Sequence, residues 1–156
     1  LKAKYQDDAT AALVTLRADG QVGDSVSCSL QTSKALIEAG LHPATGGPGT
    51  QVCSGDMLLE ALVACSGVTL AAVATALGIN IGDAKIHAEG DLDFRGTLGV
   101  EKSAPVGFRA IRLSFDLGEH VSDEQRATLL KLTERYCVVL QTLKGGAELT
   151  TRARSA

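Results

Sequence analysis

Four cysteines are the residues in this sequence most able to do chemistry: Cys28, Cys53, Cys65 and Cys137. A thiolate is a nucleophile that can be oxidised reversibly, whereas a buried thiol behaves as a small apolar group. No two cysteines have the C-x-x-C spacing of a zinc site, and the three histidines, at positions 42, 87 and 120, are far apart in sequence. The pattern therefore indicates redox chemistry or core packing, and no metal site.

Other common functional patterns are absent from the sequence. The Gly-rich segment 46–49 is not followed by the Lys-Ser/Thr pair of a phosphate-binding loop, and G-x-S-x-G does not occur. The net charge is −3, and the aromatic residues are three Phe, two Tyr and no Trp. An acidic protein with few aromatic residues lacks both the positive charge and the stacking surfaces that nucleic acids need. We therefore expect no cofactor and no nucleic-acid partner.

The cysteines must be positioned by an alternation of strands and helices. Asp19-Gly20 is typical of a tight hairpin turn between the first two strands. Ser122 and Gln125 form a capping-box pattern that opens a helix carrying Cys137 on an apolar stripe with Leu129, Leu130, Tyr136 and Leu140. Period-two patterns predict strands over 11–16, 22–30, 85–95, 107–117 and 147–152. This order predicts one α+β domain over residues 1–156, with helices packed on an antiparallel sheet.

Cys65 belongs to the most apolar segment, a helix predicted over 56–77. Ser54 or Asp56 would cap its start, and Gly78 would end it. Its 17 residues from 61 to 77 carry no charge, but they are rich in Ala, Thr, Ser and Gly, which favours a buried core helix over a membrane span. The N-terminal residues show no signal-peptide pattern, so we expect a cytoplasmic protein without membrane attachment.

Taken alone, Cys28, Cys65 and Cys137 are each explained better by core packing than by chemistry. Cys28 falls on the apolar face of its strand, and nothing around Cys53 gives that residue a role. Cys65 and Cys137 differ in their surroundings. Cys65 ends the run DMLLEALVAC, which starts at Asp56, and Cys137 lies within ERYCVVLQTL, residues 134–143.

These two contexts, in this order, resemble the osmotically induced protein/organic hydroperoxide resistance (OsmC/Ohr) family. Members of that family carry one cysteine in a long Ala/Leu-rich central helix, and a second in a later C-P-V-x-x-T-L context. The resemblance extends over nearly the whole chain. It implies antiparallel sheets packed on the central helix, in an intertwined homodimer with an active site at each end of the interface.

The resemblance also implies a thiol peroxidase. Cys65 would attack an organic hydroperoxide, and Cys137 would resolve the sulfenic acid to a disulfide. A dithiol or a lipoylated protein would then reduce that disulfide. An arginine would keep the Cys65 thiolate ionised. Arg17 occupies about the right place, and Asp56 or Glu60 would hold it there. Arg109 is the alternative arginine, although its position also fits an exposed side chain at the end of a strand.

The sequence departs from the family pattern at three places. Cys53-Ser54-Gly55 stands where a proline usually precedes the central helix, Val138 replaces the proline after the second cysteine, and the acid at position 56 is Asp instead of Glu. Two other functions stay open at this point. One is a protein of the same fold that binds an apolar ligand with little turnover, and the other is a structural role in which both cysteines are inert.

Overall fold

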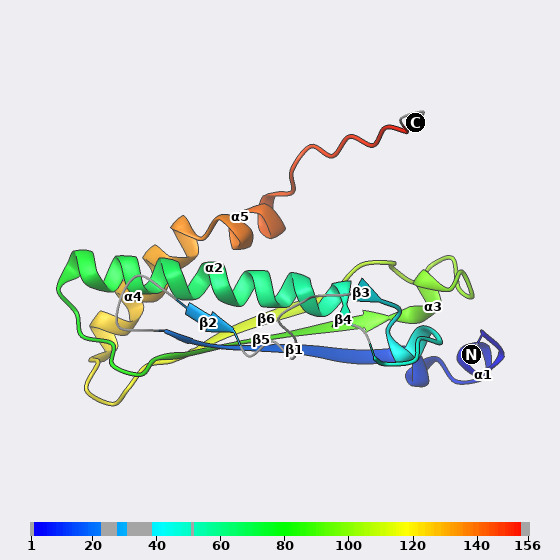
Figure 1. Ribbon diagram of the computed structural model, residues 1–156, viewed down its shortest axis with the longest axis horizontal. Coiled ribbons are helices and arrows are strands. Elements are labelled where there is room, and N and C mark those ends of the chain that lie inside the picture. Colours follow the sequence, from blue (N-terminus) through cyan, green and yellow to red (C-terminus); the bar gives the residue numbers. More distant parts are fainter. Residues whose placement is uncertain (1, 23–27, 31–38, 51, 154–156) are drawn as a thin grey trace.

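The computed structural model describes residues 2–22, 28–30, 39–50 and 52–153, and side chains in part of the first three ranges are not described. A long helix lies along one face of a four-stranded antiparallel sheet (Figure 1). The sheet order is β2-β1-β5-β6, formed by β2 (Cys28–Leu30), β1 (Leu13–Val22), β5 (Lys85–Asp93) and β6 (Ala110–Asp116). This confirms the predicted α+β fold.

The other elements surround this helix and sheet. A two-stranded parallel sheet pairs β3 (Ala39–Gly40) with β4 (Val52–Cys53) just before the long helix. The remaining elements are α1 (Lys2–Asp7), η1 (Ala9–Ala12), η2 (Pro43–Thr45), α2 (Ser54–Leu77), α3 (Phe94–Thr97), α4 (Asp123–Tyr136) and α5 (Val138–Gly145). Helices α4 and α5 pack against α2.

Helix α2 begins two residues earlier than predicted. Its N-cap is Cys53, which makes no side-chain capping bond, so the predicted caps Ser54 and Asp56 are wrong and both lie in the first turn. Gly78 ends the helix with φ 66, as predicted, because a residue without Cβ adopts the left-handed region easily. Among the described helices, α2 is the one long and apolar enough to cross a membrane. Its larger apolar residues pack into the protein core, among them Leu59, Leu62, Val63, Leu70 and Val73.

The predicted hairpin turn at Asp19-Gly20 is wrong. Strand β1 continues through both residues, and Asp19 pairs with His87 while Gly20 pairs with Ile86. Of the strand predicted over 22–30, Val22 belongs to β1 and Cys28–Leu30 forms β2, while residues 23–27 lie outside the described part of the chain. A long ladder with β5 therefore outweighs the local preference of the Asp-Gly pair for a tight turn.

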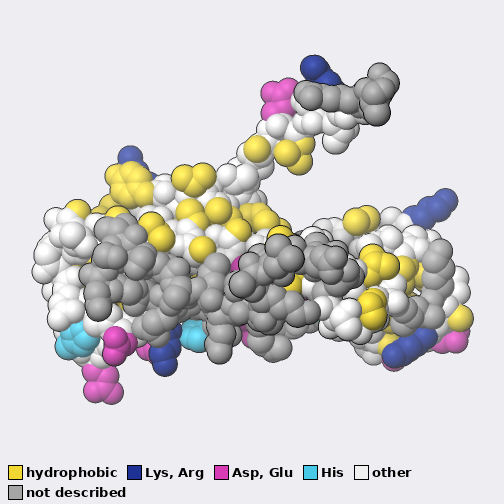
Figure 2. All heavy atoms as spheres, in the orientation of Figure 1, with side chains coloured by type: hydrophobic (Ala, Val, Ile, Leu, Met, Phe, Trp, Pro, Cys, Tyr) yellow, Lys and Arg dark blue, Asp and Glu magenta, His cyan; other side chains and the backbone are white. Residues whose placement is uncertain are grey.

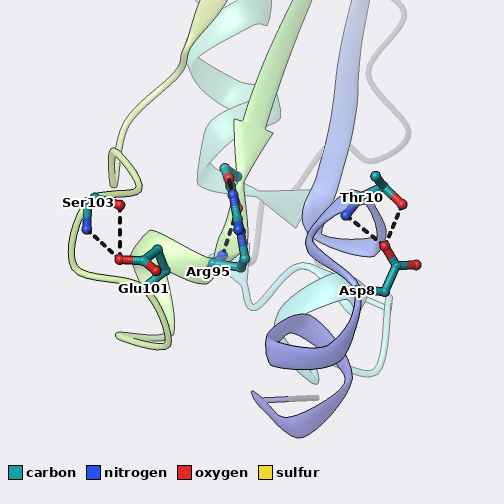
Figure 3. Close-up of polar contacts among 6 residues, drawn as sticks. Asp8, Thr10, Arg95, Glu101 and Ser103 are labelled. Carbon is teal, nitrogen blue, oxygen red and sulfur yellow. Dashed lines mark hydrogen bonds and ion pairs between the residues drawn. The ribbon is translucent and has the colours of Figure 1, made fainter.

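Strand β5 follows the predicted alternation until its last residue. Ile86, Ala88 and Leu92 are buried, and the period-two pattern would place Asp93 on the opposite, exposed face, but Asp93 is 1% exposed. Asp93 is buried because it caps α3 and pairs with Arg95, whose Nη2 lies 2.5 Å from Asp93 Oδ2. Figure 3 shows Arg95 at the end of β5, near loops held by local bonds such as those from Ser103 to the Glu101 carboxylate.

The second long helix ends one residue before Cys137. The capping box of Ser122 and Gln125 opens α4 as predicted, but the apolar stripe does not continue through its end. Tyr136 is 57% exposed, and Cys137 has φ −70 and ψ 108, an extended residue that separates α4 from α5. The strand predicted over 147–152 is wrong, because these residues form an exposed extended tail that leaves the body of the protein (Figure 1).

The surface of α2 away from the sheet is apolar. Leu58 and Val68 are exposed there, and Figure 2 shows hydrophobic side chains gathered over this helix. A soluble protein rarely leaves a long apolar strip uncovered. This surface is therefore a candidate for association.

Candidate active site

Two helical segments bring Cys65 and Cys137 together. Cys65 lies near the middle of α2, and Cys137 lies at the junction of α4 and α5, which pack against α2. The Cys137 thiol hydrogen-bonds the Cys65 sulfur. Both cysteines are free thiols, with Cys65 half-buried and Cys137 completely buried. A more accessible sulfur thus lies in contact with an inaccessible one, 72 residues away in the sequence.

A hydroxyl of α2 also contacts the buried sulfur. Ser66 Oγ lies 3.3 Å from Cys137 Sγ, and either atom can be the donor. Both residues are 0% exposed. The Cys137 sulfur therefore contacts two successive side chains of α2, the thiol of Cys65 and the hydroxyl of Ser66.

The environment of Cys65 favours its thiolate. Burial alone would raise the pKa of the Cys65 thiol, but hydrogen bonds from the Val139 N–H, the Cys137 thiol and the Val138 N–H bring that pKa below its ordinary value. Val138 and Val139 are the first two residues of α5, whose N–H groups have no partner within the helix. The start of a helix is favourable for negative charge, so these amides stabilise the sulfur as an anion.

The environment of Cys137 favours its neutral thiol. Burial raises the pKa of Cys137, and the adjacent Cys65 sulfur raises it further because a second negative charge there would be repelled. The hydrogen bond with Ser66 opposes this shift without reversing it. The Cys65 thiol therefore ionises more readily than an ordinary cysteine, whereas the Cys137 thiol stays protonated.

The predicted acidic partners, Asp56 and Glu60, lie toward the start of α2. Both are half-buried, and neither has a hydrogen bond or ion pair with a described residue. Burial raises the pKa of Asp56, and the nearby His42 partly offsets that effect. Asp56 precedes Cys65 by nine residues, which in a helix is about 14 Å along the axis and on the opposite side. The structure therefore gives Asp56 no contact with the sulfur atoms.

The predicted activating arginines are not among the strongest influences on Cys65. The backbone of Arg17 pairs with Glu89 of β5, and its side chain falls outside the described part of the structure. Arg109 lines a different cavity of about 430 Å³, with Leu13, Thr15, Asp91 and Ala110. The groups that most lower the pKa of Cys65, among the described residues, are backbone amides, a thiol and a hydroxyl.

Neither of the two remaining cysteines contributes to the described site. Cys53 is a half-buried free thiol at the N-cap of α2, packed against the core. The side chain of Cys28 is outside the described part of the chain. In the described ranges, no group of three His, Cys, Asp or Glu residues is placed to hold a metal ion.

The amides of Val138 and Val139 and the hydroxyl of Ser66 were not predicted from the sequence. A proline after Cys137 would have marked the start of a new helix, because proline favours the first helical position. Valine gives no such signal, so the break between α4 and α5 was hidden. Ser66 could have been noticed only as a small polar residue beside Cys65.

Solved structures of known proteins share this fold. An OsmC-like hydroperoxide resistance protein from Jannaschia sp. CCS1 is similar with a TM-score of 0.62 at 17% identity, over 92% of this chain and 95% of that chain. An OsmC-like protein from Mycoplasma pneumoniae has a TM-score of 0.59 at 19% identity, over 86% of each chain. No curated protein matches the sequence.

The sequence also matches a family model directly. The model of the OsmC-like protein family covers residues 47–152, a range that holds α2, Cys65, the junction of α4 and α5, and Cys137. The two sulfurs that the fold brings into contact thus lie within the matched region. The chain belongs to the OsmC-like protein family.

Proposed function

We propose that the protein is a thiol peroxidase that reduces organic hydroperoxides. The observation that carries this proposal is the pairing of an accessible Cys65 thiol of lowered pKa with a buried Cys137 thiol that hydrogen-bonds it. The similarity to an OsmC-like hydroperoxide resistance protein supports the same assignment.

The first step would oxidise Cys65. Its thiolate attacks the outer oxygen of the hydroperoxide, the O–O bond breaks, and an alkoxide leaves that takes a proton to become the alcohol. Cys65 becomes a sulfenic acid, so two electrons pass from sulfur to the peroxide. The N–H groups of Val138 and Val139 favour this step because they stabilise the attacking thiolate.

The second step would join the two cysteines. The Cys137 sulfur attacks the sulfenic sulfur of Cys65, a disulfide forms, and the hydroxyl leaves with the thiol proton as water. A thiol of raised pKa already in contact with Cys65 suits this role, because it does not compete for the peroxide but is close enough to react.

The described residues beside the site favour an apolar substrate. Val138, whose N–H bonds Cys65, is 71% exposed. Tyr136, which precedes Cys137 in the sequence, is 57% exposed. Such side chains lose water-exposed apolar area when an organic group packs on them. We therefore expect cumene hydroperoxide to react faster than hydrogen peroxide.

Disulfide mapping tests the proposal. The reduced protein is mixed with one equivalent of cumene hydroperoxide, and its disulfides are identified by mass spectrometry. The expected product is a Cys65–Cys137 disulfide with Cys53 unmodified. Unreacted thiols at both positions would overturn the peroxidase, and retention of an apolar ligand without oxidation would favour a binding protein of this fold.

The cycle needs a reductant, and we propose a dithiol such as a lipoylated protein. The dithiol would return Cys65 and Cys137 to thiols and become a disulfide itself, which balances the two electrons given to the peroxide. A reducing compartment such as the cytoplasm would maintain the resting thiols. Turnover with dihydrolipoamide but not with glutathione is the expected result of a steady-state assay with each reductant.

We also propose that the protein is a homodimer. The apolar surface of α2 that includes Leu58 and Val68 would be covered by the second copy, and two-fold dimers are the commonest assembly. Sedimentation analysis should give a mass near twice the 16.1 kDa of one chain. A single species at the monomer mass would contradict this proposal.

A further inference from the structure

The Ser66 hydroxyl makes a different kind of hydrogen bond from the hydroxyls of Thr69 and Thr75 on the same helix. Ser66 is the next residue after Cys65, yet its described hydrogen bond is with Cys137. Thr69 and Thr75 on the same helix donate to the carbonyl oxygens four residues earlier, Cys65 at 2.7 Å and Ala71 at 2.8 Å. Small hydroxyl residues in helices commonly make that local bond. Ser66 instead makes a contact 71 residues away in sequence.

We propose that Ser66 is a positioning residue for the disulfide-forming step, and that its hydroxyl holds the Cys137 sulfur against Cys65 and stabilises that sulfur as it loses its proton. This inference rests on the proposed peroxidase function and adds a role for a residue that touches the resolving sulfur. It concerns the second step alone, because Ser66 is not among the strongest influences on the Cys65 pKa.

The geometry explains why one residue can do this. Successive side chains of a helix point about 100° apart, so the side chains of Cys65 and Ser66 enclose an angle of that size on α2. The Cys137 sulfur lies in that angle, in contact with both. Without the hydroxyl, the sulfur would keep its contact with Cys65 but lose the second contact that fixes its direction.

The chemistry of the step explains why a hydroxyl is useful there. As the Cys137 sulfur attacks the sulfenic acid of Cys65, its proton leaves with the hydroxyl as water, and negative charge grows on sulfur before the S–S bond is complete. Cys137 and Ser66 are both completely buried, so no bulk water can stabilise that charge. A donated O–H bond from Ser66 can do so.

The test compares Ser66→Ala with a matched control, Thr75→Val, which removes a hydroxyl that bonds only the helix backbone. Single-turnover reactions with cumene hydroperoxide are followed by trapping the Cys65 sulfenic acid with dimedone and by quantifying disulfide and sulfinic acid by mass spectrometry. In S66A, sulfenic acid should form at the wild-type rate, and disulfide should form about 3- to 10-fold more slowly. T75V should match wild type in both steps.

Two further readouts separate positioning from packing. Slower resolution should let a second hydroperoxide oxidise Cys65, so S66A should accumulate sulfinic acid with excess hydroperoxide. Its disulfide step should also need higher pH, because the Cys137 thiolate has lost a donor. Ser66→Thr, which keeps the hydroxyl, should restore at least part of the rate.

The outcomes distinguish this inference from the function it rests on. If wild type forms the disulfide and S66A forms it equally fast with the same pH dependence, the role of Ser66 is wrong while the peroxidase stands. If S66A slows sulfenic acid formation as much as disulfide formation, Ser66 acts on packing and the inference is also wrong. If wild type forms no sulfenic acid at all, the peroxidase proposal fails and the role of Ser66 with it.

Discussion

The ionisable groups of the sulfur pair and of the outer face of the sheet have different kinds of neighbours, and these neighbours shift their pKa values in different ways. At the sulfur pair, burial raises the pKa of Cys65, and the groups that lower it are neutral, chiefly backbone amides and a second thiol. On the face of the sheet away from α2, Arg112 pairs with Asp91 through Nη1 to Oδ2 at 2.5 Å and Nη2 to Oδ1 at 2.9 Å. Thr15 adds a bond to Asp91 at 2.7 Å.

The difference shows that a charged partner holds one group ionised, whereas neutral donors lower the pKa of the other. The Arg112 guanidinium and the Thr15 hydroxyl hold the pKa of Asp91 well below its usual range, so this carboxylate stays ionised and has its acceptors occupied. Hydrogen bonds from neutral groups lower the pKa of Cys65 and so favour its thiolate. Four substitutions test this difference between the sulfur pair and the sheet.

The largest effect is expected from Cys65→Ser. Removing the attacking sulfur should reduce hydroperoxide turnover by on the order of 10³-fold or more, because Cys137, the other thiol of the site, is completely buried. The measurement is the rate of cumene hydroperoxide consumption with dihydrolipoamide. Cys53→Ser serves as the control and should retain the wild-type rate, and equal losses in both variants would place the reaction elsewhere.

Val138→Pro should weaken the support of the Cys65 thiolate. Proline lacks the N–H that Val138 donates, while it suits the first position of α5, and the extended backbone of Cys137 (ψ 108) suits the residue before a proline. The pKa of Cys65 should rise only in part toward its ordinary value, because the Val139 N–H is retained.

The pH dependence of Cys65 alkylation by iodoacetamide measures this change. The rate follows the thiolate, so it rises with pH and levels off above the pKa, and V138P should move that curve to higher pH. Val138→Ala keeps the N–H and should follow the wild-type curve. If the proline and alanine variants behave alike, the amides do not set the pKa and a cation such as Arg17 becomes the better explanation.

Asp91→Asn should affect stability and leave turnover within about twofold. A carboxyl whose pKa is lowered by folding stabilises the folded state above its unfolded pKa, near about 4, and that contribution disappears as the pH falls through the folded pKa. Urea unfolding should show D91N less stable than wild type at pH 7, with the difference shrinking in acid. A large loss of turnover would connect the sheet face to the site.

The smallest effect is expected from Thr133→Val. The Thr133 hydroxyl is buried without a hydrogen-bond partner in the described structure, in contrast to Ser66, whose hydroxyl is bonded. Replacing an unsatisfied buried hydroxyl with a methyl group should raise the free energy of unfolding by up to about 1 kcal/mol. Urea denaturation measures this change, and a clear loss of stability would mean that the hydroxyl has a partner in solution.

The sequence alone was sufficient for the elements whose patterns are local. The end of α2 at Gly78, the capping box of Ser122 and the alternation through Ile86, Ala88 and Leu92 all follow from side-chain periodicity and from the backbone preferences of single residues. The contexts of Cys65 and Cys137 were also sufficient to indicate the family. These features depend on residues a few positions apart, which is the range that a sequence pattern records.

Tertiary structure decided the features that depend on partners far away in the chain. The ladder with β5 carries β1 through the Asp-Gly pair, and Arg95 makes the burial of Asp93 possible. The break at Cys137 turns two amides toward Cys65 and directs the sulfur to Ser66, 71 residues away. A thiol pKa depends on which donors reach the sulfur in space. Packing of α5 against α2 supplies those donors here, and no local pattern specifies that packing.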